Sequence, residues 1–345
     1  MLIWKTITGK LVDLSRKEQE ILDIEYENLQ YFLHTGHDLG LHPDNKRQAL
    51  RSYKEIKRRE YPILIGKGML KLEEKPTTIC RYRVRIPIGL SKYGLWCTFK
   101  SYFTEWSSVE LCRSKLYRRD GEYYLYITIR KEVALKKTYS HILPVDLGIR
   151  NSAVTVSPSG KPRFYGRRLR RIRGWWFYIH RKLGRKAKKW RNRESRQITD
   201  QLHKIARDIV EQAVRYDALI VLGDLRGIRK KKMGTGRRLK RLMSHWPYHR
   251  LKSYIVYKAN WKGIAVVEID EGYTSKICSG CGALGRREIQ GLFKCPSCGL
   301  ELNADVNAAR NIRARGYMLL AGGDVTRPIT LKAVSGVQGT SNRFM

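Results

Sequence analysis

Acidic residues are scarce in this chain of 345 residues, and long apolar runs are missing. Lys and Arg number 70 against 31 Asp and Glu, which leaves a formal net charge of +39. No uninterrupted apolar run reaches the roughly 18 residues that a membrane-spanning helix needs. The opening stretch "MLIWKTITGKLVDLSRKEQE" is too charged for a secretory signal. These absences argue against a membrane or secreted protein and predict a chain that meets no membrane.

The excess of positive charge points to a polyanionic partner. A charge this large repels itself within a compact chain unless something offsets it. Neutralising phosphates releases condensed counterions, so nucleic acid is the partner that the composition favours. The alternative is a basic soluble protein with no such partner. Clustering favours nucleic acid, because 15 of the 33 residues from Lys161 to Arg193 are Lys or Arg and none is Asp or Glu.

Two stretches supply the candidate phosphate contacts. In "CRYRVRIPI" the apolar residues alternate with arginines, which predicts a strand with one cationic face, the weaker candidate. Aromatic residues, among them Trp175 and Trp176, interleave with the densest charge, where they either pack on the core or stack on bases. The candidate contacts are Arg81, Arg83, Arg85, Arg167, Arg168, Arg170, Arg171, Arg173, Lys182, Arg185, Lys186, Lys188, Lys189 and Arg191.

Residues 1–138 predict a β-structure with a small helical insert. Ser15 followed by Glu18 is a capping box, and Leu22, Tyr26, Leu29 and Leu33 then recur at helical spacing. A second basic helix is expected over about 45–59. Asp120-Gly121 between two alternating runs predicts a hairpin turn.

A second unit begins near His141. Three short strands, the first ending at Asp146, precede an amphipathic helix over 198–213 and the apolar strand "ALIVLGD". The stretch 229–241 predicts a flexible basic loop. A helix ending at Gly263 and a further strand then follow. This order is the RNase H-like pattern, in which three antiparallel strands and two parallel ones share a sheet, and the Asp146 strand is expected at its centre.

Four of the seven cysteines form two Cys-x-x-Cys pairs, which are Cys278, Cys281, Cys295 and Cys298. Glycines beside each pair permit tight turns that aim both thiolates at one ion, so the pattern predicts a structural zinc ribbon with no open coordination position. The alternatives are a redox pair or a disulfide. Cys80, Cys97 and Cys112 are expected to be ordinary core residues.

Three features together resemble the TnpB family of transposon-encoded RNA-guided DNA endonucleases, relatives of Fanzor proteins and type V CRISPR effectors. Asp146 is followed by Gly148, Thr274-Ser275-Lys276 introduces the cysteine knuckle, and "DVNAARNI" begins at Asp305. The resemblance covers about 145–312. It implies an α+β and α/β multidomain chain, with a wedge β-barrel over 1–138 carrying a helical recognition insert (about 14–62), a RuvC-like nuclease domain over 139–274, a zinc ribbon over 275–302, a final catalytic helix over 303–320 and a flexible tail over 321–345.

The resemblance also implies a catalytic Asp-Glu-Asp set that holds two magnesium ions for phosphodiester hydrolysis. Asp146 matches the first acid and Asp305 the last, but the middle Glu of the family pattern falls on Gly223. We predict that Glu271, at the end of the neighbouring strand, takes its place, as in rearranged relatives. Glu268 and Asp224 are the alternatives.

The same resemblance implies a guide RNA from the transposon end, a double-stranded DNA target, and a monomer in the cytoplasm of a prokaryote. Two rival functions stay open. A nuclease-inactive, RNA-guided DNA-binding repressor is favoured by Gly223, and a conventional DNA-joining transposase would also use three acids. The ribbon placed just before the last acid argues against the transposase.

Overall fold

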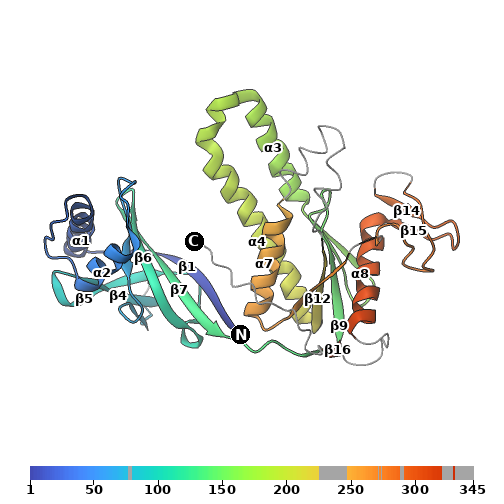
Figure 1. The fold of residues 1–345 in the computed structure, drawn as a ribbon, viewed down its shortest axis with the longest axis horizontal. Coiled ribbons are helices and arrows are strands. Elements are labelled where there is room, and N and C mark those ends of the chain that lie inside the picture. Colours follow the sequence, from blue (N-terminus) through green and yellow to red (C-terminus); the bar gives the residue numbers. More distant parts are fainter. Residues whose placement is uncertain are drawn as a thin grey trace. The chain divides into compact units, whose positions relative to one another are not determined.

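The computed structural model describes residues 1–76, 80–224, 247–270, 272, 274–287, 291–320 and 329–330, with the backbone alone at 224 and 329–330. The chain divides into two compact units, Leu2–Glu132 and a second unit that holds Met1 and the chain from Val133 onward (Figure 1). The predicted basic loop at 229–241 lies outside the described residues, as does the predicted tail over 321–345 except for 329–330. No helix among the described segments is both long enough and apolar enough to cross a bilayer.

The first unit is built on a seven-stranded antiparallel sheet. Its edge strands do not pair with each other, so the predicted barrel is an open sheet in its hydrogen bonding. Asp120 and Gly121 have φ of 51° and 74°, which is the left-handed geometry of a tight hairpin turn, as predicted. The order is β2 (Ile63–Ile65), β6 (Glu110–Arg119), β7 (Glu122–Glu132), β1 (Leu2–Val12), β5 (Ser91–Lys100), β4 (Tyr82–Ile88) and β3 (Lys71–Glu74).

Two helices accompany this sheet, α1 (Arg16–Thr35) and α2 (Pro43–Ser52). The capping box of Ser15 and Glu18 is present as predicted, but α1 buries Phe32 where we expected Leu33. The prediction of a second helix reaching residue 59 is wrong, because α2 ends at Ser52. Tyr53 leaves the helix, donates to the Pro62 carbonyl at 2.8 Å and packs on the ring of Tyr61.

Glu25 ties the helices to the sheet although it is a charged residue exposed by only 1%. Its carboxylate accepts hydrogen bonds from the backbone N–H of His42 and Gly89 and from the Asn45 side chain, at 3.1, 2.7 and 2.7 Å. These donors come from the N-cap of α2, its first turn and the β4–β5 turn. A buried carboxylate is tolerated when its oxygens are satisfied in this way.

The second unit is built on a mixed five-stranded sheet. β9 is central and runs parallel to β12 and antiparallel to β10, while β13 continues the parallel part and β11 the antiparallel part. This is the strand arrangement predicted from the sequence. The order is β11 (Pro162–Tyr165), β10 (Ala153–Val156), β9 (His141–Asp146), β12 (Ala218–Asp224) and β13 (Val266–Asp270). A separate two-stranded ribbon consists of β8 (Thr138–Tyr139), which directly precedes β9 in the chain, and β16 (Ile329–Thr330). Its two strands are antiparallel.

Helices cover both faces of this sheet (Figure 1). α4 (Arg191–Arg215) and α7 (Tyr248–Trp261) lie on one face, where Gln212 of α4 meets Thr155 of β10 at 3.3 Å. α8 (Ala304–Leu320) lies on the other, where a Cβ at Gly316 would come within 3.0 Å of Ile142 and 3.3 Å of Val221. The remaining elements of the unit are α3 (Arg167–Leu183), η2 (Gly184–Trp190), β14 (Leu292–Lys294) and β15 (Glu301–Asn303); η1 (Trp106–Ser108) belongs to the first unit.

Glu25→Ala should destabilise the first unit by roughly 2–4 kcal/mol, because it leaves the buried Asn45 amide and two part-buried backbone N–H groups without an acceptor. The exposed Glu20, paired with Arg16 at the surface, supplies the control, since Glu20→Ala should change the free energy of unfolding by less than about 0.5 kcal/mol. Urea unfolding followed by far-UV circular dichroism measures both. Equal midpoints for the two variants would contradict the role assigned to Glu25.

Candidate functional site

Asp146 and Asp305 lie at the same end of the strands and on the same face of the five-stranded sheet. Asp146 ends β9 and pairs with Val154 of β10, so both side chains point to one face. Val154 packs there against Val306 and Ala309 of α8. Because Gly316 of α8 meets Ile142 near the start of β9, the helix runs opposite to β9. Its first turn, with Asp305, therefore lies at the carboxyl ends of the parallel strands.

The Asp305 carboxylate is held by its neighbours. Asn151, from the loop after β9, donates to one carboxylate oxygen at 2.8 Å, and a guanidinium nitrogen of Arg287 lies 4.0 Å from the other. The side chain of Asn303 caps α8 by accepting from the Asp305 backbone N–H at 2.9 Å. Gly148 lets the loop turn tightly, since a Cβ there would meet the Asn151 carbonyl oxygen at 2.8 Å. Sequence reasoning assigned no role to Asn151, Asn303 or Arg287.

Of the remaining candidate acids, only Glu268 has a side chain that the structure describes. Glu268 is in register with Leu222, which is itself in register with Val145, so its side chain lies on the face opposite Asp146. There it forms an ion pair with Lys252 of α7. Glu271 lies outside the described residues, as does the side chain of Asp224.

Gly223 stands one residue beyond Leu222 on β12, so it belongs to the face of Asp146 and α8. Ile269, its partner on β13, belongs to the same face. The position at which the family pattern has a Glu therefore faces the edge that carries the two Asp residues, and here it has no side chain.

Two buried asparagines of α8 fasten the segment between β13 and the cysteines. Asn311 donates to the carbonyls of Thr274 and Ile277, both at 2.7 Å. Asn307 donates to the Ile277 carbonyl at 2.7 Å and accepts from the Ser279 N–H at 2.9 Å. The same helix that presents Asp305 thus anchors the cysteine knuckle. Their spacing of one helical turn was visible in the sequence, but nothing there indicated their partners.

The four cysteines of the two pairs gather at one point, with their sulfurs all within 4.8 Å of one another. The two turns repeat the same backbone bonds: Gly282 N–H to the Cys278 carbonyl at 3.0 Å, and Gly299 N–H to the Cys295 carbonyl at 3.1 Å. Four sulfurs so placed fit one tetrahedral zinc ion and no open position. Backbone N–H groups of Cys298 and Ser297, and the neighbouring thiols, lower the pKa of Cys295 to about 6.

The other three cysteines lie in the first unit. Cys80 and Cys97 are buried, as expected for core residues, and burial raises the pKa of Cys97 to about 12. Cys112 is only half-buried, so the expectation of a core position is wrong for it. It lies where β6 and β7 shift register between Leu111 and Ser114.

The densest basic stretch forms a hairpin of α3, η2 and α4, here called the cationic hairpin (residues 167–215) (Figure 1). Bonds from Trp176 to Gln197 and from His180 to Glu194 join its two arms. Of the predicted contacts here, all but Arg173 are exposed. Burial lowers the pKa of Arg173. The exposed ones are Arg167, Arg168, Arg170, Arg171, Lys182, Arg185, Lys186, Lys188, Lys189 and Arg191.

The cationic face of β4 is partly offset by acids of β3. Arg83 is in register with Glu73, and Arg81 forms an ion pair with Glu74. The Arg83 guanidinium also lies 5.8 Å from the centre of the Trp96 ring. Arg83 and Arg85 are half-buried, so this face offers less free positive charge than the cationic hairpin does.

Part of the second unit matches a known family model, and longer parts of the chain are similar to known proteins. The family model described as "Cas12f1-like, TNB domain" matches residues 248–312. A TnpB-like protein of Methanocaldococcus jannaschii is 29% identical over 53% of this chain and 71% of its own. The CRISPR-associated endodeoxyribonuclease Cas12f1 of Sulfoacidibacillus thermotolerans is 43% identical over 32% of this chain and 25% of its own. The putative RNA-guided DNA endonuclease InsQ of Escherichia coli is 31% identical over 47% of each chain.

Solved structures show the same fold. A complex titled AacC2c1–sgRNA–extended non-target DNA matches 74% of this chain and 55% of that chain, with a TM-score of 0.52 and 9% identity. Fold and site together define an α/β protein. Its four-cysteine ribbon directly precedes α8, the helix that packs on one face of the five-stranded sheet. The chain is similar to TnpB-like proteins, to an RNA-guided DNA endonuclease and to CRISPR-associated endodeoxyribonucleases. It spans 71% of the first of these relatives but less than half of InsQ and Cas12f1.

Zinc should bind at about one ion per chain and be lost in Cys281→Ser and Cys298→Ser, because each removes one of four thiolates. Elemental analysis of the purified full chain measures this. Cys112→Ser, in the first unit, is the matched control and should keep its zinc. Retention of zinc in the Cys298 variant, or equal loss in the control, would contradict the assignment.

Acid should release the same zinc, since protons compete with the metal for thiolate sulfur. The lowered pKa of Cys295 favours its thiolate, and a bound metal ion favours the thiolate further. Zinc should therefore be retained at neutral pH and lost as the pH falls well into the acid range. Chelator-trapped release across a pH series checks the direction. Release that begins well above neutral pH would count against it.

Proposed function

We propose that this protein is an RNA-guided DNA endonuclease of the TnpB type that cuts DNA by two-metal-ion hydrolysis in a RuvC-like site. The observation that carries the proposal is the placement of Asp146 and of the first turn of α8, which holds Asp305, at the same end of the parallel strands and on the same face of the sheet. Relatives named RNA-guided DNA endonucleases and CRISPR-associated endodeoxyribonucleases support it. The net charge of +39 suits nucleic-acid partners.

Asp146, Glu271 and Asp305 are the proposed catalytic acids. The register of β13 puts Ile269 on the face of Asp146, and alternation in a continuing strand would assign position 271 to that face too. Arg315 of α8 donates to the Asp270 carbonyl at 2.8 Å, which brings the end of β13 to the same helix as Asp305. Glu268 is a poorer candidate because it faces α7 and pairs with Lys252. Asp224 is in register with Asp270 on β13, and its side chain lies outside the described residues.

Carboxylate oxygens are the donors that magnesium prefers, so the three acids fit two magnesium ions. Bound there, the ions would supply a water nucleophile and stabilise the leaving oxygen of the phosphodiester. The protein's own contribution is orientation. Asn151 fixes one oxygen of Asp305, and the Asn303 cap fixes the first turn of α8, so the carboxylate is already aimed before substrate arrives.

The cationic hairpin is proposed to bind the guide RNA from the transposon end or its pairing with the target strand. Its exposed guanidinium and ammonium groups would contact phosphates, and base pairing would supply sequence specificity. Arg81, Arg83 and Arg85 remain the weaker candidates, because Glu73 and Glu74 stand beside them. Double-stranded DNA is the proposed substrate, and the protein is proposed to act as a monomer in the prokaryotic cytoplasm, near the nucleoid. The structural zinc would keep the ribbon folded against α8.

A nuclease-inactive, guide-directed DNA-binding repressor is the second candidate. One observation favours it: Gly223 faces the carboxylate edge at the position where the family pattern has a Glu. The two matched acids, Asp146 and Asp305, and the proposed third acid, Glu271, weigh against it. The two functions differ in one measurable property, because both predict guided binding and only one predicts cleavage.

Full-length protein purified with its co-expressed flanking RNA should cleave a matched plasmid when magnesium is present. Asp146→Ala, Asp305→Ala and Glu271→Ala should each lower the cleavage rate by at least about 100-fold, as losing a preorganised electrostatic group does. Glu268→Ala and Asp224→Ala are the matched controls and should cut at near the parent rate.

Binding to the matched DNA, measured by gel shift, should survive in all five variants. If Glu271→Ala cuts normally while Asp224→Ala does not, the proposed middle acid is wrong. If the parent protein binds matched DNA and cuts nothing, the repressor is the correct function.

A further inference from the structure

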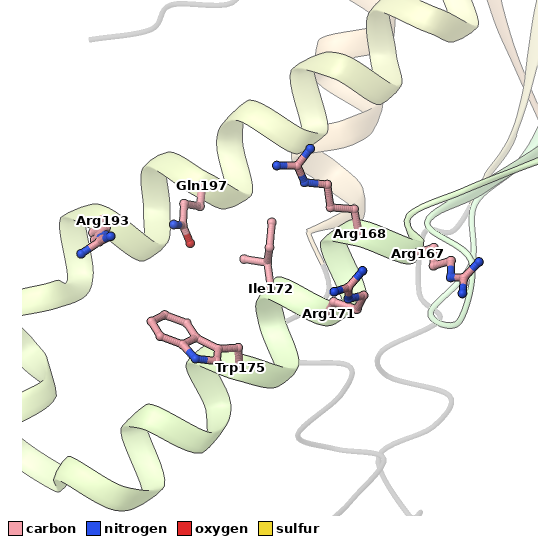
Figure 2. Close-up of a pocket in the computed structure, with 7 residues that line it drawn as sticks. All are labelled: Arg167, Arg168, Arg171, Ile172, Trp175, Arg193 and Gln197. Carbon is pink, nitrogen blue, oxygen red and sulfur yellow. The ribbon is translucent and has the colours of Figure 1, made fainter.

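The two arms of the cationic hairpin enclose a hollow of about 1180 Å³ (Figure 2). The hollow lies between α3 and the first turns of α4, and its walls combine guanidinium groups with an indole and an amide. No acid lines it. Its lining residues are Arg167, Arg168, Arg171, Ile172, Trp175, Arg193 and Gln197.

Neighbouring tryptophans of α3 have opposite roles here. Trp176 is 1% exposed, and its indole N–H donates to the Gln197 side-chain oxygen at 2.8 Å. Trp175 is 51% exposed, and its ring meets Trp176 edge-on, with centroids 4.6 Å apart and planes at 77°. Trp176 therefore packs the arms together. Trp176 braces Trp175 from one side, and about half of the Trp175 side chain stays exposed. Figure 2 shows the Trp175 ring pointing into the space between α3 and α4.

The polar groups around Trp175 are suited to a nucleotide. Within the described part of the chain, Arg167 and Arg171 have no ion-pair partner, and Arg168 is paired no more closely than an electrostatic interaction with Asp200, which helps to lower the pKa of that carboxyl. Free guanidinium groups bind phosphate through paired N–H donors, and they also stack on flat rings. Gln197 uses its oxygen on Trp176, which leaves its amide N–H groups as donors toward the hollow.

We propose that this hollow holds a single unpaired nucleotide, with its base stacked on Trp175 and its flanking phosphates on Arg167, Arg168 and Arg171. A base within a duplex already has both faces covered by neighbours, so an open indole between two helices suits a base turned out of its stack. The volume is ample for one nucleotide. The inference rests on the proposed function and deepens it; the nucleotide could come from the guide RNA or from a DNA strand.

The test uses the full chain and fluorescently labelled U12 and dT12 oligonucleotides, with anisotropy measured over a series of salt concentrations. Trp175→Ala should weaken binding by roughly 5- to 150-fold, the range for losing one stacked base, and leave the slope of affinity against salt unchanged. Trp175→Phe keeps an aromatic face and should retain most of the affinity. Arg171→Gln should instead lower the salt slope by about one.

Phe177→Ala is the matched control. Phe177 lies on the same helix and is 41% exposed, but it does not line the hollow, so its loss should change affinity less than about twofold. Circular dichroism establishes that each variant folds. Loss with U12 alone assigns the nucleotide to RNA, loss with dT12 alone assigns it to DNA, and loss with both supports a site open to either.

Parent-like affinity in Trp175→Ala, or an equal loss in Phe177→Ala, would overturn the proposal. So would a change in the salt slope of Trp175→Ala with no loss at high salt, because that indicates electrostatics alone. The measurement needs no cleavage. A protein that binds through Trp175 and cuts nothing would therefore refute the endonuclease and leave the nucleotide site standing.

Discussion

The docking of α8 on one face of the five-stranded sheet is the contact on which the rest of the second unit depends. Small residues allow α8 to pack closely against the sheet. Ala309 packs with Val154, and a Cβ added at Gly316 would crowd Ile142 and Val221. Because α8 runs opposite to β9, its first turn reaches the carboxyl ends of the parallel strands, where Asp146 is the last residue of β9. The same helix holds the cysteine knuckle through Asn307 and Asn311. One packing contact thus positions a carboxylate and a metal-binding ribbon together.

Positive charge is partly offset by acids in the first unit and left exposed on the cationic hairpin of the second. The acids of β3 offset part of the cationic face of β4, whereas the exposed arginines of α3 face a hollow with no acid in its lining. Burial of Trp176 against Gln197 keeps the arms of the cationic hairpin together despite the repulsion of their like charges. Phosphates would neutralise such a surface, so the proposed binding of nucleic acid would also stabilise this hairpin.

The middle acid shows how strand parity limits the choices. Leu222, Val145 and Glu268 are in register across three strands, so their side chains point to one face of the sheet. The residues that follow, Asp146 and Gly223, point to the other face. Moving a carboxylate by one position along β12 or β13 therefore moves it to the wrong side of the sheet. A glutamate at the end of a neighbouring strand can compensate for Gly223 only if it keeps that parity. Glu268 does not, and its ion pair with Lys252 has a simpler role in joining β13 to α7.

Local signals in the sequence were sufficient wherever the physics is local. The capping box of Ser15, the turn at Asp120-Gly121, the order of the five strands and the four cysteines all follow from spacing and backbone preference. The end of α2 did not, because the packing of Tyr53 on Tyr61 decides it. Neither did the partners of Asn151, Asn307 and Asn311, nor which tryptophan of the adjacent pair is open. The sequence alone determined which residue types were available and on which elements. Tertiary packing decided which of them meet, because burial and side-chain hydrogen-bond partners depend on segments up to 156 positions apart.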